Sequence, residues 1–196
     1  MTINNSIVSV FPKHILCLDN ICLEYLDVYS LCAYKLIEQN GCYTNELLNV
    51  KSTHRTAANL HEYQDFHHLV SVIERYIVEF GSFLGYDIET CFRMRILNMW
   101  VNINEQGGYN FPHIHSGSLL SGVFYVKSPS KNKIIFFDNY SNVEIGINSH
   151  GEGYDTKSFD CIPGRLLMFK SDLIHGNTPQ IDTEEKIAIS FNIVRT

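Results

Sequence analysis

The 196-residue chain contains no apolar run that approaches the ~20 residues needed to cross a bilayer. Its first residues also lack the basic-then-apolar order of a secretion signal. Basic charge is scarce: 15 Lys and Arg stand against 21 Asp and Glu, for a formal net charge of −6. A broad basic surface for nucleic acid or anionic lipid is therefore not expected. We expect a cytoplasmic protein with no membrane partner.

The six cysteines form no C-x-x-C pair. A disulfide framework would need a denser set of cysteines, and a zinc knuckle would need close pairs. We expect reduced thiols packed as small hydrophobic side chains. The chain also lacks internal repeats, low-complexity tracts and Pro-, Gly- or Ser-rich linkers. At about 150 residues per domain, its length predicts a single domain over residues 1–196.

The spacing of apolar residues changes near the middle of the chain. Over 22–37 and again over 66–80 they recur at three and four, which predicts helices in a first part of about residues 1–90. From Cys91 the period becomes two, which indicates strands. The β-rich runs are residues 91–104, 118–128, 133–139, 143–148, 158–164, 164–170 and 186–194. The sequence therefore predicts a mainly β (α+β) jelly roll over about residues 91–196, with the N-terminal helices packed outside one sheet.

Three of the nine histidines are placed so that they could meet. One residue separates His113 from His115, so both imidazoles point to the same side of an extended segment. His175 follows sixty residues later, at the end of an apolar strand. Imidazole is the commonest metal ligand in proteins and binds in its neutral form. An H-x-H pair alone also occurs without a metal, so the surrounding residues decide whether this is a metal site.

Polar residues on two other strands point to a small molecule bound near these histidines. Lys186 begins the last strand, and Ser190 and Asn192 share its face. A cation and polar side chains are unusual on a face that only packs a core, and they suit a bound carboxylate. Asn102 lies on a strand face with other amides, which would need hydrogen-bond partners if buried.

The ordered motifs of residues 98–193 resemble those of the 2-oxoglutarate/Fe(II)-dependent oxygenases, in a small branch that writes H-x-H where prolyl hydroxylases write H-x-D. The motifs are W-x-N, GGYN-x-x-H-x-H, SGVFYV, the Pro-Gly-x-Leu strand, the distal His and the closing ISFN. The resemblance implies a double-stranded β-helix and an oxygenase that uses Fe(II), 2-oxoglutarate and O2. It implies hydroxylation as the default reaction, on a primary substrate that the sequence does not identify.

The resemblance also implies roles for single residues. His113 and His175 would be iron ligands, and His115 stands where the family usually has Asp or Glu. Lys186 takes the place of the basic residue that holds the far carboxylate of 2-oxoglutarate. The other residues implied around this cosubstrate are Asn102, Tyr125, Ser190 and Asn192.

Two hypotheses remain for the identity of the third metal ligand. Either the triad consists of three histidines, or a carboxylate enters from elsewhere in the chain. Asp138, at the end of the KIIFFD run, is the candidate carboxylate. Asp172, three residues before the distal histidine, is a second one.

Other functional classes stay open at the level of sequence. One is a cupin-type three-histidine enzyme without 2-oxoglutarate, since the spacing from Gly107 to His115 matches the start of a cupin motif. Another is a zinc enzyme, because three histidines and a water also form a catalytic zinc site. A third is a non-catalytic jelly-roll binding protein. The sequence leaves open whether the chain forms a homo-oligomer.

Overall fold

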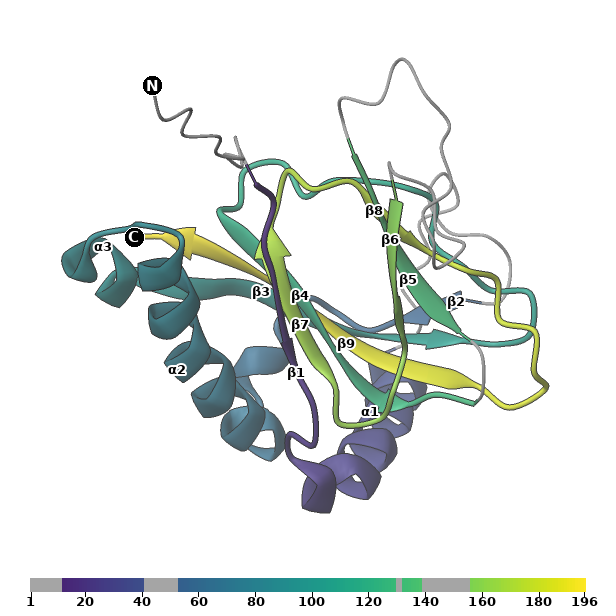
Figure 1. Ribbon diagram of the computed structural model, residues 1–196. Coiled ribbons are helices and arrows are strands. Elements are labelled where there is room, and N and C mark those ends of the chain that lie inside the picture. The colour runs from purple at the N-terminus through teal and green to yellow at the C-terminus, as the bar shows by residue number, and fades with distance from the viewer. Residues whose placement is uncertain (1–11, 41–52, 130–131, 139–155) are drawn as a thin grey trace, which may run out of the picture.

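The computed structural model describes residues 12–40, 53–129, 132–138 and 156–196, which form two antiparallel sheets and a helical layer (Figure 1). The larger sheet contains, in spatial order, β1 (Ile15–Leu18), β7 (Leu166–Lys170), β4 (Leu120–Lys127), β9 (Lys186–Arg195), β3 (Met94–Asn104) and β2 (Thr53–Arg55). The smaller sheet contains β6 (Thr156–Asp160), β5 (Lys133–Phe137) and β8 (His175–Asn177). The predicted mainly β fold is confirmed.

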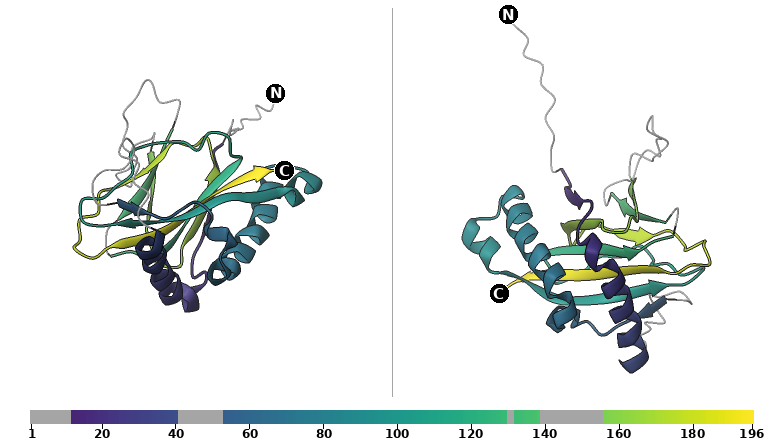
Figure 2. Two further views of the ribbon diagram at one scale, coloured as in Figure 1. Left: turned by 180° about the vertical axis from the view of Figure 1, so that it is seen from behind. Right: turned by 90° about the horizontal axis from the view of Figure 1, so that it is seen from below.

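The helices cover the face of the larger sheet that lies away from the smaller sheet (Figures 1 and 2). They are α1 (Leu26–Asn40), α2 (His67–Phe83) and α3 (Ile88–Phe92), with 3-10 turns at Leu23–Tyr25, Leu60–Glu62 and Gln64–Phe66. Helix α2 buries a stripe at helical spacing that includes Leu69, Ile73 and Ile77, as its apolar period predicts. The expectation that helices pack outside one sheet is therefore confirmed.

Alternation along the central strands divides the core in two. On β9, Ile187 and Ile189 face the helices, whereas Ala188 faces the smaller sheet. On β4, Phe124 faces the helices and Tyr125 faces the smaller sheet. Successive side chains of a strand point to opposite faces, so the same strands close one core and present a second face to the space between the sheets.

Strand β3 departs from the regular alternation predicted for residues 91–104. Its pairing with β9 shifts register between Ile96 and Asn98. Before this irregularity the even-numbered residues of β3 face the helices, and after it the odd-numbered residues do. Met94 packs in the helix-side core, as does Met99 beyond the shift. The uninterrupted period of two predicted for residues 91–104 was wrong because of this bulge. Cys91 and Phe92 end α3 and Arg93 is its C-cap, so the strand begins at Met94.

Two strands lie in the part of the chain that was predicted as helical. β1 pairs with β7 and β2 pairs with β3, so they form the two edges of the larger sheet. The short β8 was not predicted either, and the predicted strand at 143–148 lies outside the described residues. The division of one domain into parts of about 1–90 and 91–196 stays a prediction.

Two further expectations concern cysteines and membranes. The cysteines that the structure describes as free thiols are Cys17, Cys22, Cys32, Cys91 and Cys161. Within the described ranges, none of the helices has the length and apolar character needed to span a bilayer.

Candidate active site

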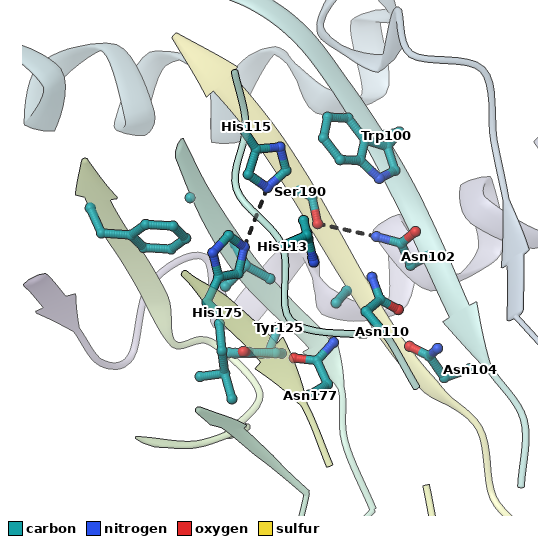
Figure 3. Close-up of a pocket in the computed structure, with 15 residues that line it drawn as sticks. Trp100, Asn102, Asn104, Asn110, His113, His115, Tyr125, His175, Asn177 and Ser190 are labelled. Atoms are coloured by element: carbon teal, nitrogen blue, oxygen red, sulfur yellow. Dashed lines mark hydrogen bonds between the residues drawn. The ribbon is translucent and has the colours of Figure 1, made fainter. Parts of the chain in front are cut away.

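The three histidines singled out in the sequence meet between the two sheets (Figure 3). The backbones of His113 and His175 form a bridge, with N–H to O distances of 2.9 and 3.1 Å in the two directions. The N–H of His115 donates to the carbonyl of Ser171 at 2.9 Å. One ligand atom from each of the three imidazoles lies within 4.8 Å of the others. This is the separation expected of ligands arranged around one ion.

Backbone carbonyls orient two of these rings. Nδ1 of His113 lies 2.6 Å from the carbonyl oxygen of Phe111, and Nδ1 of His175 lies 2.9 Å from that of Leu173. A carbonyl oxygen only accepts hydrogen bonds, so each Nδ1 carries a proton, and in the neutral form of the ring Nε2 keeps its lone pair. Metal-binding histidines have this second hydrogen bond in most proteins. The Nε2 atoms of His115 and His175 are 3.3 Å apart, and both face the centre of the cluster.

Burial keeps two of the three rings neutral. Loss of hydration lowers the pKa of His115 to about 4 and that of His175 to about 3, with a smaller contribution from His113 in each case. Both rings are therefore uncharged near pH 7, which is the form that binds a metal.

A carboxylate does not join the histidines within the described ranges. The group of described residues able to hold a metal consists of His113, His115 and His175. Asp138, the alternative ligand, lies just after β5, and its carboxylate pairs with Lys13 at 2.8 Å. The side chain of Asp172 is exposed. The geometry therefore favours the three-histidine set over either carboxylate.

Polar side chains from β3 and β9 form one wall of the pocket beside the histidines (Figure 3). Trp100, Asn102 and Asn104 line it because alternate residues of β3 face the same side. The amide of Asn102 donates to the hydroxyl of Ser190 at 3.1 Å. Two predicted site residues, Asn102 and Ser190, are thus brought together in the pocket.

Strand β9 begins with Lys186, which is paired with the pocket residue Asn104 but is not itself among the residues that line the pocket. Lys186 is 0% exposed, and its Nζ has no hydrogen-bond partner in the part of the chain that the structure describes. The hydroxyl of Tyr125 is also buried without a partner there. Loss of hydration lowers the pKa of Lys186 and raises the pKa of Tyr125. Two unmatched donors on the strands that face the pocket fit the carboxylate of a bound anion such as 2-oxoglutarate.

Asn192 is positioned differently from the other predicted cosubstrate residues. Its side-chain oxygen accepts from Ser121 at 2.8 Å, and its amide nitrogen donates to Asn98 at 2.8 Å. Ser121 in turn shares a 2.7 Å hydrogen bond with Ser171. The structure therefore holds Asn192 in an internal network, and it is not among the residues that line the pocket.

Several pocket residues were not assigned a role from the sequence. The side chains of Asn110 and Asn177 line the pocket, and the amide oxygen of Asn110 is buried without a partner in the described residues. Arg55 stacks over Trp100, with 4.2 Å between its Cζ and the ring centroid. Asn110 could have been found from the sequence, because it belongs to the GGYN motif. The position of Arg55 beside Trp100 depends on the pairing of β2 with β3, which was not predicted.

Comparisons with solved structures show the same fold in several enzymes. A prolyl-4-hydroxylase from Pseudomonas putida superposes with a TM-score of 0.68 at 10% identity, covering 94% of each chain. The viral collagen prolyl hydroxylase of Paramecium bursaria Chlorella virus-1, solved as a 2-oxoglutarate complex, gives 0.60 at 14% identity over 92% of this chain and 96% of that one. HygX from Streptomyces hygroscopicus, solved with nickel and 2-oxoglutarate, gives 0.62 at 10% identity over 94% and 84%. At these identities the likeness shows the fold.

Sequence comparison supplies the family. A search of curated proteins finds no match. Residues 98–192 match the model of a family described as "Putative 2OG-Fe(II) oxygenase". This segment contains the three histidines, the polar wall of β3 and most of β9 including Lys186. By this match, residues 98–192 belong to the family of putative 2-oxoglutarate- and Fe(II)-dependent oxygenases.

Proposed function

We propose that the chain binds Fe(II) through the Nε2 atoms of His113, His115 and His175, and that it hydroxylates a C–H bond of a further substrate. When bound, Fe(II) and 2-oxoglutarate supply the chemistry by which O2 is reduced, 2-oxoglutarate becomes succinate and CO2, and an oxygen atom enters the substrate. The observation that carries the proposal is the buried Nζ of Lys186, which has no hydrogen-bond partner among the described residues. Lys186 lies opposite the pocket residue Asn104 and on the same strand as the pocket residues Ala188 and Ser190.

The residues of the chain have the task of binding and orienting these partners. Lys186 would hold the far carboxylate of 2-oxoglutarate, with the hydroxyl of Tyr125 as a second donor. A lysine offers a point charge rather than the fork of an arginine, so this second donor would add directional control. Asn102 and Ser190, hydrogen-bonded to each other, lie along the same wall and would contact the bound cosubstrate.

Apolar side chains surround the remaining side of the pocket. Val123, Ala188 and Phe169 line it, and Phe169 packs against the ring of His175 with 4.6 Å between centroids. Low local polarity excludes water and strengthens the interaction between Lys186 and a carboxylate. The pocket is thus suited to binding a small dianion beside a metal.

Turnover of 2-oxoglutarate without the primary substrate tests this assignment. We expect the Fe(II)-loaded protein to form succinate slowly, and we expect Lys186→Met to need roughly 10- to 100-fold more 2-oxoglutarate, because a charge-assisted hydrogen bond is lost. The methionine side chain fills a similar volume. Lys127→Met is the matched control, since the side chain of Lys127, at the end of β4, is 41% exposed.

The iron content of Lys186→Met distinguishes loss of cosubstrate binding from loss of the metal. It should stay near normal in Lys186→Met, because Lys186 is not proposed as a ligand. Equal 2-oxoglutarate dependence in Lys186→Met and the parent protein would refute the role of Lys186. If the iron-loaded protein neither binds nor consumes 2-oxoglutarate, the cupin-type or zinc alternative replaces the present one.

We also propose a cellular location and consider the oligomeric state of the chain. Cysteine usage favours the cytoplasm, and a homo-oligomer stays a prediction. Light scattering during size-exclusion chromatography would measure the number of copies.

A further inference from the structure

The three imidazoles of the cluster are not held in the same way. Backbone carbonyls orient the rings of His113 and His175, whereas none among the described residues orients that of His115. The main-chain N–H of His115 donates to the carbonyl of Ser171 at 2.9 Å. The N–H of Ser171 in turn donates to the carbonyl of Leu119 at 3.1 Å. Ser171 therefore holds both ends of the turn that follows His115.

A row of polar side chains leads from Ser171 across three strands of the larger sheet. Asn98 of β3 and Ser121 of β4 each lie directly opposite Asn192 of β9, so the three side chains share one face. Oγ of Ser171, the residue after β7, lies 2.7 Å from Oγ of Ser121. The hydroxyl of Ser121 donates to the side-chain oxygen of Asn192 at 2.8 Å. The amide nitrogen of Asn192 donates to the side-chain oxygen of Asn98, also at 2.8 Å.

The hydrogen bonds of this network run in one direction. A serine has a single O–H, and that of Ser121 donates to Asn192, so Ser121 accepts from the hydroxyl of Ser171. Ser121, Ser171 and Asn192 are 1%, 2% and 7% exposed. Because a buried hydroxyl without an acceptor is costly, the side chain of Ser171 has one favoured orientation. The network thus fixes the residue whose carbonyl holds His115.

The surroundings of the network argue against a role in stability alone. Val123 follows Ser121 on the same face of β4, and Phe169 precedes Ser171 on the same face of β7, and both pack in the apolar cluster between the sheets. Apolar side chains of similar shape would stabilise this region about as well as hydrogen-bonded polar ones. What a fully satisfied polar network adds is a single defined arrangement.

We propose that Ser171 is a positioning residue of the metal site: its side chain, held by Ser121, keeps His115 where its imidazole binds the metal together with the other two. This inference rests on the proposed function, because it takes His115 as the third ligand. Hydrogen bonds behind metal ligands hold them in binding geometry, and their loss weakens metal binding. Asn192, expected from the sequence to contact 2-oxoglutarate, acts instead on a metal ligand through Ser121 and Ser171.

The affinity of the full chain for Zn(II) tests this, because it reports on the ligands without any turnover. We expect Ser171→Ala to bind Zn(II) roughly 2- to 12-fold more weakly, the effect of one neutral hydrogen bond. In this variant the carbonyl that accepts from His115 is still present, and Ser121 still has Asn192 as its acceptor. Ser121→Ala, which removes the middle hydroxyl, should weaken binding in the same range. Competition with a chelator measures each affinity.

Thr90→Val is the matched control. Thr90 is also buried, and its hydroxyl donates to the carboxylate of Asp87 at 2.7 Å at the start of α3, in the helical layer. This variant should keep the Zn(II) affinity of the parent protein even where its free energy of unfolding, measured with urea, decreases. Circular dichroism verifies that every variant is folded.

A double-mutant cycle shows whether Ser171 acts through His115. Ser171→Ala should weaken Zn(II) binding in the parent protein and have no further effect in His115→Ala, since the ligand that it positions is then absent. A role of Ser171 in the general stability of the sheet would instead lower the affinity by the same factor in both backgrounds.

Three results would overturn the inference and leave the proposed function in place: unchanged Zn(II) affinity in Ser171→Ala and Ser121→Ala, an equal loss in Thr90→Val, or the same effect of Ser171→Ala with and without His115. An unchanged Zn(II) affinity in His115→Ala is a different outcome. It would contradict the three-histidine site of the proposed function, and the role of Ser171 with it.

Discussion

At the scale of single residues, two backbone carbonyls decide which nitrogen of each ring is available. Nδ1 of His113 and Nδ1 of His175 face the carbonyls of Phe111 and Leu173, so their Nε2 atoms face the cluster. Among the described residues no backbone carbonyl orients the ring of His115, whose position depends on the backbone hydrogen bond from its N–H to Ser171. We therefore expect His113 and His175 to be preorganised for metal binding, with His115 completing the set.

The contribution of His115 is tested against that of Asp138. His115→Ala should sharply reduce the iron bound per chain after desalting, because it removes one of three ligands. Asp138→Ala should keep the iron content of the parent protein, since its carboxylate pairs with Lys13. Elemental analysis measures both. The reverse pattern would show that the metal site includes a carboxylate.

The hydroxyl of Tyr125 is expected to contribute less than Lys186. Tyr125→Phe removes one neutral hydrogen-bond donor and leaves the buried ring in place. We expect a roughly 2- to 12-fold weaker affinity for 2-oxoglutarate, the range given by one neutral hydrogen bond. Calorimetric titration measures it. An unchanged affinity would show that the hydroxyl does not reach the carboxylate.

Much of the site could be predicted from residue types and spacing. The H-x-H pair and the distal histidine meet as expected, and Lys186 lies on the pocket strand with Ser190. Asn192 could not be placed in the same way, because its partner Ser121 comes from β4. Residues on one strand share a face, yet the cross-strand neighbour decides whether a side chain is already satisfied.

At the scale of elements, close packing fixes how the central strands approach one another. Gly122 lies on β4, where an added Cβ would overlap the ring of Phe191 and come 2.6 Å from the carbonyl oxygen of Leu167. Neighbouring strands and rings can move little in a packed core. A residue with a side chain at this position should therefore strain the sheet that bears the site.

Gly122→Ala should lower the free energy of unfolding by about 1–3 kcal/mol through overpacking. Urea denaturation followed by circular dichroism measures the change. Ser71→Ala, on the exposed side of α2, should change it by about 0.5 kcal/mol or less. Equal stability of Gly122→Ala and the parent protein would show that β4 can move away from β9.

The elements themselves were predicted unevenly. The long apolar stripe of α2 and the alternation in β4 and β9 are strong local signals. The bulge in β3 and the three-residue β2 depend on pairing between strands distant in sequence. Local periodicity cannot show either of them, and for that reason the contact of Arg55 with Trp100 was not predicted.

At the scale of the whole molecule, folding keeps imidazoles neutral that would otherwise take up protons. In the unfolded chain a histidine titrates near pH 6.5, whereas in the folded metal-free protein His115 titrates at about 4 and His175 at about 3. Between these values the unfolded state binds more protons. The free energy of unfolding of the metal-free protein therefore decreases as the pH falls.

The metal-free protein should consequently lose stability as the pH is lowered from about 6.5 towards 4. The slope of Tm against pH should be smaller in a His115→Gln/His175→Gln variant, which removes two of the groups responsible. Added Zn(II) should raise Tm near pH 7 and lose this effect at lower pH, because protons compete for the ligands. Equal slopes in the variant and the parent protein would contradict neutral, buried imidazoles.

The central claim is that iron and 2-oxoglutarate bind together in this pocket. An anaerobic titration of the Fe(II)-loaded protein with 2-oxoglutarate measures this directly, through the weak visible charge-transfer band of a keto acid chelated to Fe(II). The account predicts a saturable band in the parent protein, no band in His175→Ala, and a band that requires roughly 10- to 100-fold more 2-oxoglutarate in Lys186→Met. A parent protein that retains iron yet develops no band at saturating 2-oxoglutarate would contradict it.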